Sequence, residues 1–389
     1  MKKGKILIMN KEKYFYKIKP ISREKLFYVK ALKHPIESIN KIARIKKLYK
    51  NNIDNYYNYS KTKKTFYKAL KQIALKTNDG EELAKYFYQD KFEIIKEGKI
   101  EENKPILICL IKNEMIRIRK FLEHYKKLEI NNFIFIDNNS TDGTLELLKK
   151  EENINIFQIK EKYSTIRRQA WINKVISYFG FNKWYLIVDS DEFLTYKDSE
   201  NKNISDLIKY LQNNKIKRAR ALMIDMYSKE SIFGGTTGES KDFTKKYCYF
   251  DSDSYQEKKH KHFELIIGGM RNRVFGKYAD INPFLVKYPL IYFEKGDLQY
   301  NSHYSSPFYK NFNSQVLLAL LHYKFLEGDL EKIKEIVKEK NYALGSKQYI
   351  AYLKAYEENP VLKFKNDKSK KYESSKSLEQ IKLIQNIEI

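Results

Sequence analysis

Two carboxylates one residue apart, Asp189 and Asp191, directly follow the apolar run at residues 184–188. A continuous apolar run of this length is typical of a strand buried in a sheet. Ligands of open α/β sheets bind at the carboxyl ends of strands. An Asp-x-Asp pair at such an end can hold a hard divalent cation through its oxygen atoms. Because that cation can neutralise a departing diphosphate, the pair predicts a metal site for a phosphate-bearing ligand.

A second acidic turn follows another apolar run. Residues 137–144 read Asp-Asn-Asn-Ser-Thr-Asp-Gly-Thr and come directly after the run at 133–136. This composition suits a turn that caps a helix. A functional interpretation adds a nucleotide contact, in which Asp137 binds the base or ribose and Asn139 lies in the same turn. The residues alone leave both interpretations open.

Hydrophobic periodicity indicates the elements that must position these turns. Buried strands are predicted at 106–111, 133–136, 154–159 and 184–188. Helical patterns separate them, at 116–128, 141–148 and 163–179. Strands that alternate with helices predict an α/β fold, with a largely parallel central sheet flanked by helices.

The alternation weakens beyond residue 215, and the two ends of the chain differ from its middle. A strand is predicted at 219–227, and helical periodicity returns at about 309–326, 329–340 and 346–357. Before Pro105 the chain is basic and helical in pattern, with Ser60 as the cap of a helix that runs to about Thr77. We therefore predict three parts: a helical N-terminal extension at 1–103, an α/β domain at 104–326 and a helical C-terminal tail at 327–389.

Several motifs, taken in order, resemble a bacterial subgroup of the family-2-like glycosyltransferases, which have the GT-A fold. The first three are Lys112-Asn113-Glu114, the acidic turn at 137–144 and Asp189-Ser190-Asp191-Glu192-Phe193-Leu194. The later ones are residues 268–276, 287–290, Ser302-His303 and 320–325. The resemblance covers about 105–326 and leaves out both ends of the chain.

The resemblance implies a GT-A fold, which is Rossmann-like, and a sugar transfer that depends on Mn²⁺ or Mg²⁺. The donor would be a nucleoside-diphosphate sugar. The acceptor would be a glycan or lipid-linked molecule in bacterial surface polysaccharide synthesis, and the transfer would be inverting. By position, Asp189 would face the ribose or the metal, and Asp191 would ligate the metal. His303 would be a further metal ligand, and the alternative is a histidine that is hydrogen-bonded in its loop.

The resemblance also implies a nucleotide pocket. Asn113 and Glu114 would line it, and Asp137 would contact the base. Family members often carry a second acid where this chain has Asn138, so the sequence departs from the family pattern at that contact.

An inverting transfer needs a carboxylate that takes the proton of the acceptor hydroxyl. Glu192, next to the metal pair, is the first candidate, and Asp225 and Glu264 are alternatives. Neighbouring strand residues point to opposite faces, so the other interpretation is that Glu192 faces away and supports the loop.

Four arginines have the chemistry to bind anions. Arg167 and Arg168 begin a predicted helix, where a guanidinium can pair with a diphosphate; the alternative is a basic, solvent-facing turn. Arg271 and Arg273 alternate in a predicted strand beside two glycines. Both would then point to one face and bind an anion or the acceptor.

Other residues of suitable type are assigned structural roles. His322 lies in an apolar stretch with a helical pattern and is predicted to be a core histidine. Asp251 and Asp253 repeat the Asp-x-Asp spacing, but no strand pattern precedes them, so a solvated loop is expected. Cys109 and Cys248 are predicted to be buried, reduced thiols.

The chain has a formal net charge of +26. Residues 1–100 contain 26 Lys and Arg against 10 Asp and Glu, or +16. A solvated face and an anionic membrane surface both explain this excess. No nucleic-acid-binding motif appears, so nucleic acid is not expected as a partner. Since no stretch approaches the length of a membrane span, we predict a cytoplasmic protein, with peripheral attachment to the inner membrane face as an alternative.

Two other functions share part of this pattern. A non-catalytic nucleotide-sugar-binding protein could use the same fold, although an intact metal pair argues against it. A phosphatase of the haloacid-dehalogenase type also has a strand followed by Asp-x-Asp. It would need downstream Lys and Asp-Asp elements, and no convincing set is present.

Overall fold

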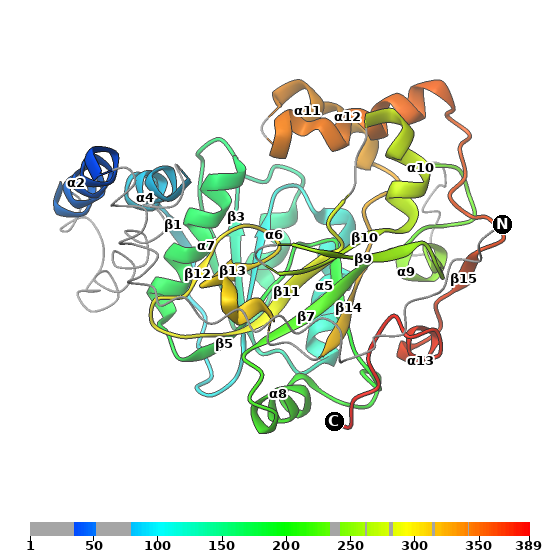
Figure 1. The fold of residues 1–389 in the computed structure, drawn as a ribbon, viewed down its shortest axis with the longest axis horizontal. Helices are drawn as coiled ribbons and strands as arrows, with labels where there is room; N and C mark the ends of the chain where they lie inside the picture. The colour runs from blue at the N-terminus through cyan, green and yellow to red at the C-terminus, as the bar shows by residue number, and fades with distance from the viewer. Residues whose placement is uncertain are drawn as a thin grey trace.

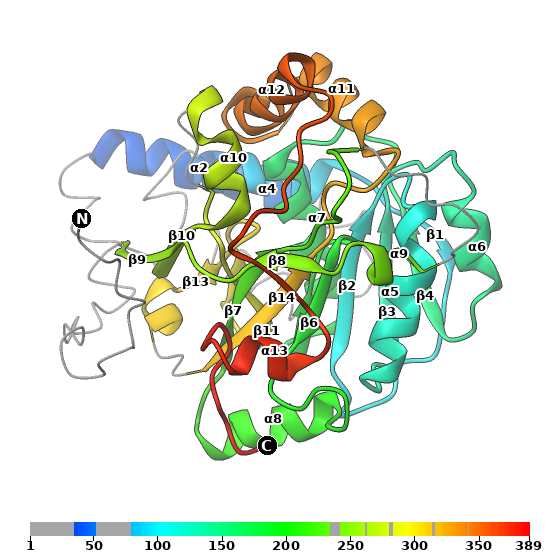
Figure 2. The same ribbon diagram turned by 90° about the vertical axis from the view of Figure 1, so that its right-hand side faces the viewer.

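The computed structural model describes residues 35–51, 79–233, 242–260, 263–279, 283–312, 316–340 and 342–389. The helix predicted from Ser60 to about Thr77 lies outside these residues. Figures 1 and 2 show a large central sheet with helices on its faces and at its ends.

The central sheet has nine strands in the order β1-β4-β3-β2-β5-β11-β7-β14-β6. The strands are β1 (Glu93–Lys96), β2 (Ile106–Ile111), β3 (Asn132–Asp137), β4 (Ile154–Gln158), β5 (Lys183–Ile187), β6 (Glu192–Thr195), β7 (Arg218–Asp225), β11 (Val286–Phe293) and β14 (Leu317–His322). Parallel pairing joins β4, β3, β2 and β5, and also joins β7 to β14. Strand β11 is antiparallel to both β5 and β7, so the two parallel groups run in the same direction. The edge strands β1 and β6 are antiparallel to their neighbours.

Helices flank this sheet and gather at two opposite ends. They are α2 (Pro35–Asn51), α4 (Asp79–Gln89), α5 (Met115–Lys127), α6 (Thr144–Lys150), α7 (Thr165–Phe179), α8 (Ile204–Asn213), α9 (Phe243–Lys246), α10 (Gly269–Ala279), α11 (Asp329–Glu339), α12 (Ala343–Glu358) and α13 (Ser375–Glu379). In both views α10, α11 and α12 lie together at one end of the molecule, and α8 lies at the other. None of the described helices is both long and apolar enough to cross a membrane.

Small two-stranded sheets and a short 3-10 helix complete the fold. They are β8 (Tyr249–Asp251) with β15 (Ser369–Lys371), β9 (Tyr255–Lys259) with β10 (Glu264–Gly268), β12 (Leu298–Gln299) with β13 (Ser305–Ser306), and η2 (Phe308–Phe312).

The predicted fold class is confirmed: the chain forms a mixed α/β fold, with a mostly parallel central sheet flanked by helices. Strand β2 coincides with the predicted run at 106–111, and β3, β4 and β5 begin or end within one residue of theirs. These strands are almost wholly buried, as continuous apolar runs require in a sheet covered on both faces.

The helical pattern predicted at about 309–326 is wrong. Residues 308–312 form the 3-10 helix η2, and residues 317–322 form β14, a fully buried strand between β7 and β6. Its sequence, Leu-Leu-Ala-Leu-Leu-His, is a short apolar run, which periodicity alone cannot assign to a strand or a helix. The error matters because β14 ends at His322.

Described parts of both flanking segments pack against the α/β domain. Strand β1, within the predicted N-terminal extension, pairs with β4, and α4 packs on α7. At the other end β15 pairs with β8, and the buried side chains of Leu378, Ile384 and Ile387 join the main core.

A buried carboxylate fixes α4 against α7. Asp90, just after α4, accepts a hydrogen bond from Trp171 Nε1 at 2.9 Å and lies 3.2 Å from Arg167 Nε. Asp90 and Trp171 are both buried. A buried indole N–H that loses its acceptor costs free energy, because no water replaces the lost partner.

We expect Asp90→Ala to lower the free energy of unfolding by about 1–3 kcal/mol, because it removes the acceptor of the Trp171 indole. Urea unfolding of the purified protein measures the change. Asp90→Asn keeps a carbonyl oxygen for the indole and should lose less. An Ala variant as stable as the wild type would contradict this role of Asp90.

Candidate metal and nucleotide site

The turns that follow β2 and β3 are joined by hydrogen bonds. The Asn113 backbone N–H donates to Ser140 Oγ at 3.0 Å, and the Thr141 N–H donates to Asn113 Oδ1 at 2.8 Å. The Glu114 N–H donates to Thr144 Oγ1 at 2.9 Å. These bonds hold two of the predicted nucleotide-binding segments together where β2 and β3 end, at the carboxyl ends of the parallel strands.

Asp137 is fully buried at the end of β3. Its carboxylate accepts hydrogen bonds from the Ser140 N–H at 3.2 Å and from Gln158 Nε2 at 3.0 Å. The neighbouring Asn138 donates to two carbonyl oxygens of the chain after β4, and Asn139 has a positive φ of 61° and an exposed side chain. Asp137 therefore shapes the turn, and its contact with a base stays a prediction.

Asp189 lies in the turn between β5 and β6 and carries two cationic partners. Arg168 contacts one carboxylate oxygen at 2.6 Å, and Lys287 contacts the other at 2.7 Å. Burial would raise the pKa of Asp189, but Arg168 and Lys287 outweigh it and hold the pKa below its ordinary value. Asp189 is therefore an anion whose orientation is fixed from both sides.

Glu192 is almost completely buried behind this turn. Its carboxylate forms an ion pair with Lys287 and accepts a hydrogen bond from the Asp189 backbone N–H at 3.1 Å. Burial would lower the pKa of Lys287, but Asp189 and Glu192 outweigh it and raise the pKa. This position matches the supporting role that the sequence left open for Glu192, and its role as a proton acceptor stays a prediction.

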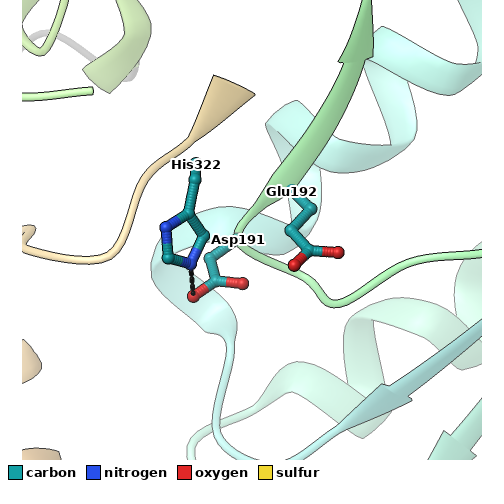
Figure 3. A group of neighbouring side chains, drawn as sticks. All are labelled: Asp191, Glu192 and His322. Carbon is teal, nitrogen blue, oxygen red and sulfur yellow. Dashed lines mark ion pairs between the residues drawn. The ribbon is translucent and has the colours of Figure 1, made fainter. Parts of the chain in front are cut away.

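Asp191 points at the end of β14. His322 Nε2 lies 3.3 Å from its carboxylate, and the two side chains face each other in Figure 3. On the other side, His322 Nδ1 lies 2.7 Å from Asp225 at the end of β7. Asp225 also accepts a hydrogen bond from Arg271 Nε at 2.9 Å. The three side chains therefore form a chain from Asp191 through His322 to Asp225.

Strand register explains how these residues meet. In β14, His322 is the Cα partner of Glu192 in β6 and of Asp225 in β7. The Tyr323 N–H also donates to the Asp191 carbonyl at 2.8 Å, which holds the turn against the end of β14.

One group of possible metal ligands is present among the described residues. Asp191, Glu192 and His322 offer ligand atoms within 4.8 Å of one another. Sequence reasoning missed His322, because its stretch was interpreted as a helix. The register of β14 beside β7 and β6 is the signal that identifies it, and that register is not local in sequence.

The other predicted ligand, His303, lies apart from this group. Its Nδ1 contacts the Val286 carbonyl at 2.9 Å, and its ring packs near Phe284. Burial, with Lys287 nearby, lowers the pKa of His303 to about 3, so the imidazole is neutral. The structure thus separates the two histidines: His322 faces Asp191, and His303 faces a backbone carbonyl of β11.

The two arginines at the start of α7 point in different directions. Arg167 contacts Asp90, donates to the Lys162 carbonyl at 2.8 Å and lies over the Tyr86 ring. Arg168 instead contacts Asp189. Successive helix residues are rotated by about 100°, so only one of the pair can face the site.

The strand predicted for Arg271 and Arg273 is wrong. Both lie on α10, and they contact different carboxylates: Arg271 contacts Asp225, and Arg273 makes a bidentate pair with Asp251 at 2.8 Å. The preceding Gly268 has φ +111°, and a Cβ there would lie 1.9 Å from the Ser254 carbonyl. The two glycines thus allow a close turn from β10 into α10.

Two further carboxylates, Asp251 and Glu264, each have an arginine partner. For Asp251 this environment differs from the predicted one. Asp251 is buried on β8 with Arg273 and Tyr227, and so is not in a solvated loop. Glu264, an alternative proton acceptor, contacts Arg220 at 2.8 Å.

Comparisons with known proteins add little to this geometry. No family model and no curated protein matches the chain. Among solved structures, residues 1–349 of TarS from S. aureus, a glycosyltransferase, are similar at a TM-score of 0.28 and 14% identity. The match covers 66% of this chain and 72% of that chain. A TM-score this low carries no argument about function.

We expect Lys287→Met to lower the free energy of unfolding by about 3–5 kcal/mol, because it leaves Asp189 and Glu192 close together without their shared cation. Urea unfolding measures the loss. Adding Glu192→Gln to the same protein removes one of the two charges and should restore part of the stability. A Lys287→Met protein with wild-type stability would show that the ammonium group does not hold this turn.

Proposed function

We propose that this protein is a glycosyltransferase that moves a sugar from a nucleoside-diphosphate sugar to a glycan or lipid-linked acceptor in bacterial surface polysaccharide synthesis. The observation that carries the proposal is the chain from Asp191 through His322 to Asp225 at the carboxyl edge of the sheet. The sequence motifs that end at the same edge support it.

The residues around Asp191 fit a divalent cation such as Mn²⁺ or Mg²⁺. A histidine that ligates a metal commonly contacts a carboxylate through its other ring nitrogen, and Asp225 is in that position for His322. Asp191 and His322 would hold the ion, and phosphate oxygens and water would supply the remaining ligands. When bound, the ion would neutralise the charge on the departing diphosphate.

Asp189 and Glu192 would have a different task. Asp189 is held by Arg168 and Lys287, and Glu192 is held by Lys287, so neither carboxylate is free of cations. The side chain of Asp189 is 32% exposed, and its carboxylate would accept a hydrogen bond from a ribose hydroxyl. Lys324, 3.7 Å from Asp191 and more exposed than Arg168 or Lys287, is the cation best placed to meet a diphosphate.

The cellular setting completes the proposal. A cytoplasmic enzyme could meet a lipid-linked acceptor at the inner membrane face, where a basic N-terminal region would favour anionic lipid. Vesicle sedimentation at low salt tests this part separately, and a full chain that ignores anionic vesicles would remove it.

We expect metal-dependent hydrolysis of a nucleoside-diphosphate sugar by the wild type and none by Asp191→Ala, because the variant lacks the carboxylate that faces His322. A panel of donors is screened with and without Mn²⁺, and release of the nucleotide is measured. Calorimetry on the same samples measures nucleotide and metal binding.

The same screen separates the alternatives. Binding of a donor without hydrolysis, even when acceptor glycans are added, would favour a non-catalytic nucleotide-sugar-binding protein. Release of inorganic phosphate from simple phosphate esters would favour a phosphatase. Wild-type protein that binds neither a nucleotide nor a divalent cation would contradict the proposal.

We expect His322→Gln to weaken Mn²⁺ binding by about 100-fold or more and His303→Gln to leave it within about threefold, because only His322 faces Asp191. Asp225→Asn should lie between the two, at about 10–100-fold, since it acts through the orientation of His322. Calorimetric titration with Mn²⁺ measures all three. The reverse order, with His303 dominant, would restore the ligand set that the sequence resemblance implies.

A further inference from the structure

The C-terminal helices α11 and α12, which lie beyond the sequence resemblance, reach the candidate nucleotide site. On α11, Lys332 Nζ forms an ion pair with Glu114 and donates to the Lys112 carbonyl at 3.3 Å. Asp329, at the start of α11, forms an ion pair with Arg117. Figures 1 and 2 show α11 and α12 side by side at one end of the sheet. The helix pair is thus fixed to the segment that follows β2.

The junction between the two helices has an unusual backbone. Lys340, Leu344, Gly345 and Ser346 all have positive φ values, between 51° and 62°. For residues other than glycine this conformation costs about 1–2 kcal/mol each. Backbone strain of this kind persists where the surrounding structure demands it, often at binding sites. The junction carries Tyr342.

Three tyrosines meet where this junction approaches the sheet. Tyr342 stacks on Tyr163, from the loop between β4 and α7, with ring centroids 4.7 Å apart and 30° between the planes. Tyr349, on α12, lies 5.0 Å from Tyr342. Lys324 lies over the Tyr349 ring at 5.0 Å. All three tyrosine residues are partly exposed.

The contacts of these rings and of their neighbours place them along the site, and nearby charges agree with that placement. Burial raises the pKa of Tyr342, and Tyr163, Tyr349, Glu114 and Asp189 add to the shift. Burial also raises the pKa of Tyr163, with Arg168 opposing the shift and Asp189 adding to it. Tyr163 lies two residues before α7, whose Arg168 contacts Asp189, so the Tyr163–Tyr342 pair lies toward Asp189. Tyr349 lies toward Asp191, through Lys324.

We propose that Tyr342 and Tyr163 form a stacking wall for the nucleobase of the donor, so that the C-terminal helices complete the nucleotide site. The inference rests on the proposed function, because a base is expected only if the donor is a nucleotide. The metal and the diphosphate belong at Asp191 and Lys324, so the nucleoside belongs at the other end, beside Asp189 and the Asn113 turn. There these two partly exposed tyrosines would offer an aromatic surface to a planar base.

Nucleotide affinity compared with pyrophosphate affinity tests the wall, because pyrophosphate has no base. A panel of nucleoside diphosphates, and pyrophosphate, are each titrated with Mn²⁺ into the full-length protein by calorimetry. We expect Tyr342→Ala to weaken the best nucleotide by about tenfold or more and to leave pyrophosphate within about twofold. Tyr342→Phe keeps the ring and should bind the nucleotide within about threefold of the wild type.

A matched control comes from the same junction. Leu344 is 87% exposed and also has a positive φ, so Leu344→Ala should leave both affinities unchanged. Circular dichroism and thermal unfolding confirm that each variant is folded.

Each outcome has a distinct meaning. Equal nucleotide affinity for the wild type and Tyr342→Ala would overturn the stacking wall and leave the proposed function standing. If Tyr342→Ala loses affinity for the nucleotide and for pyrophosphate to the same extent, the stacking wall is also overturned. The tyrosine would then only support the shape of the site. A wild type that binds no nucleoside diphosphate better than pyrophosphate would overturn the proposed function, and the wall with it.

Discussion

The site depends on the neutralisation of four carboxylates that converge at the carboxyl ends of the parallel strands. Asp189, Asp191, Glu192 and Asp225 are close enough for their charges to repel, and buried charges without partners cost several kcal/mol. Each has a cationic or histidine partner, and the partners are Arg168, Lys287, His322, Lys324 and Arg271. These partners come from α7, β11, β14, the segment after β14, and α10. The positions of these elements therefore depend on one another, because each must supply a partner for the same group of carboxylates.

The sequence predicted the part of this site that depends on local pattern. Strand β5 is a continuous apolar run, and the acidic pair follows it, so Asp189 and Asp191 could be placed at the edge of the sheet from spacing alone. Strands β2, β3 and β4 were predictable for the same reason. In a parallel sheet covered on both faces, local hydrophobicity and burial coincide.

The partners were not predictable in the same way, because they depend on contacts between distant segments. His322 meets Asp191 and Asp225 only through the register of β14 between β6 and β7. Its apolar run has the length at which a strand and a buried helix look alike. Arg271 had a sequence context suited to anion binding, but the Gly268 turn places it on a helix that faces Asp225. For Arg167 and Arg168, the pattern predicted the start of the helix, and the packing of α7 on α4 and on the sheet sets which arginine faces inward.

That last case shows how the flanking segments contribute to the site. Asp90 and the Tyr86 ring hold Arg167 on the side of α4. The next residue, Arg168, is directed to the other side and contacts Asp189. On the other flank, Lys332 and Asp329 of α11 contact Glu114 and Arg117 beside the Asn113 turn. The segments before and after the region of resemblance thus both contact elements that carry site residues. Residues outside 105–326 therefore contribute to the site: Asp90 holds Arg167 beside Arg168, and the C-terminal helices supply Tyr342, which stacks on Tyr163.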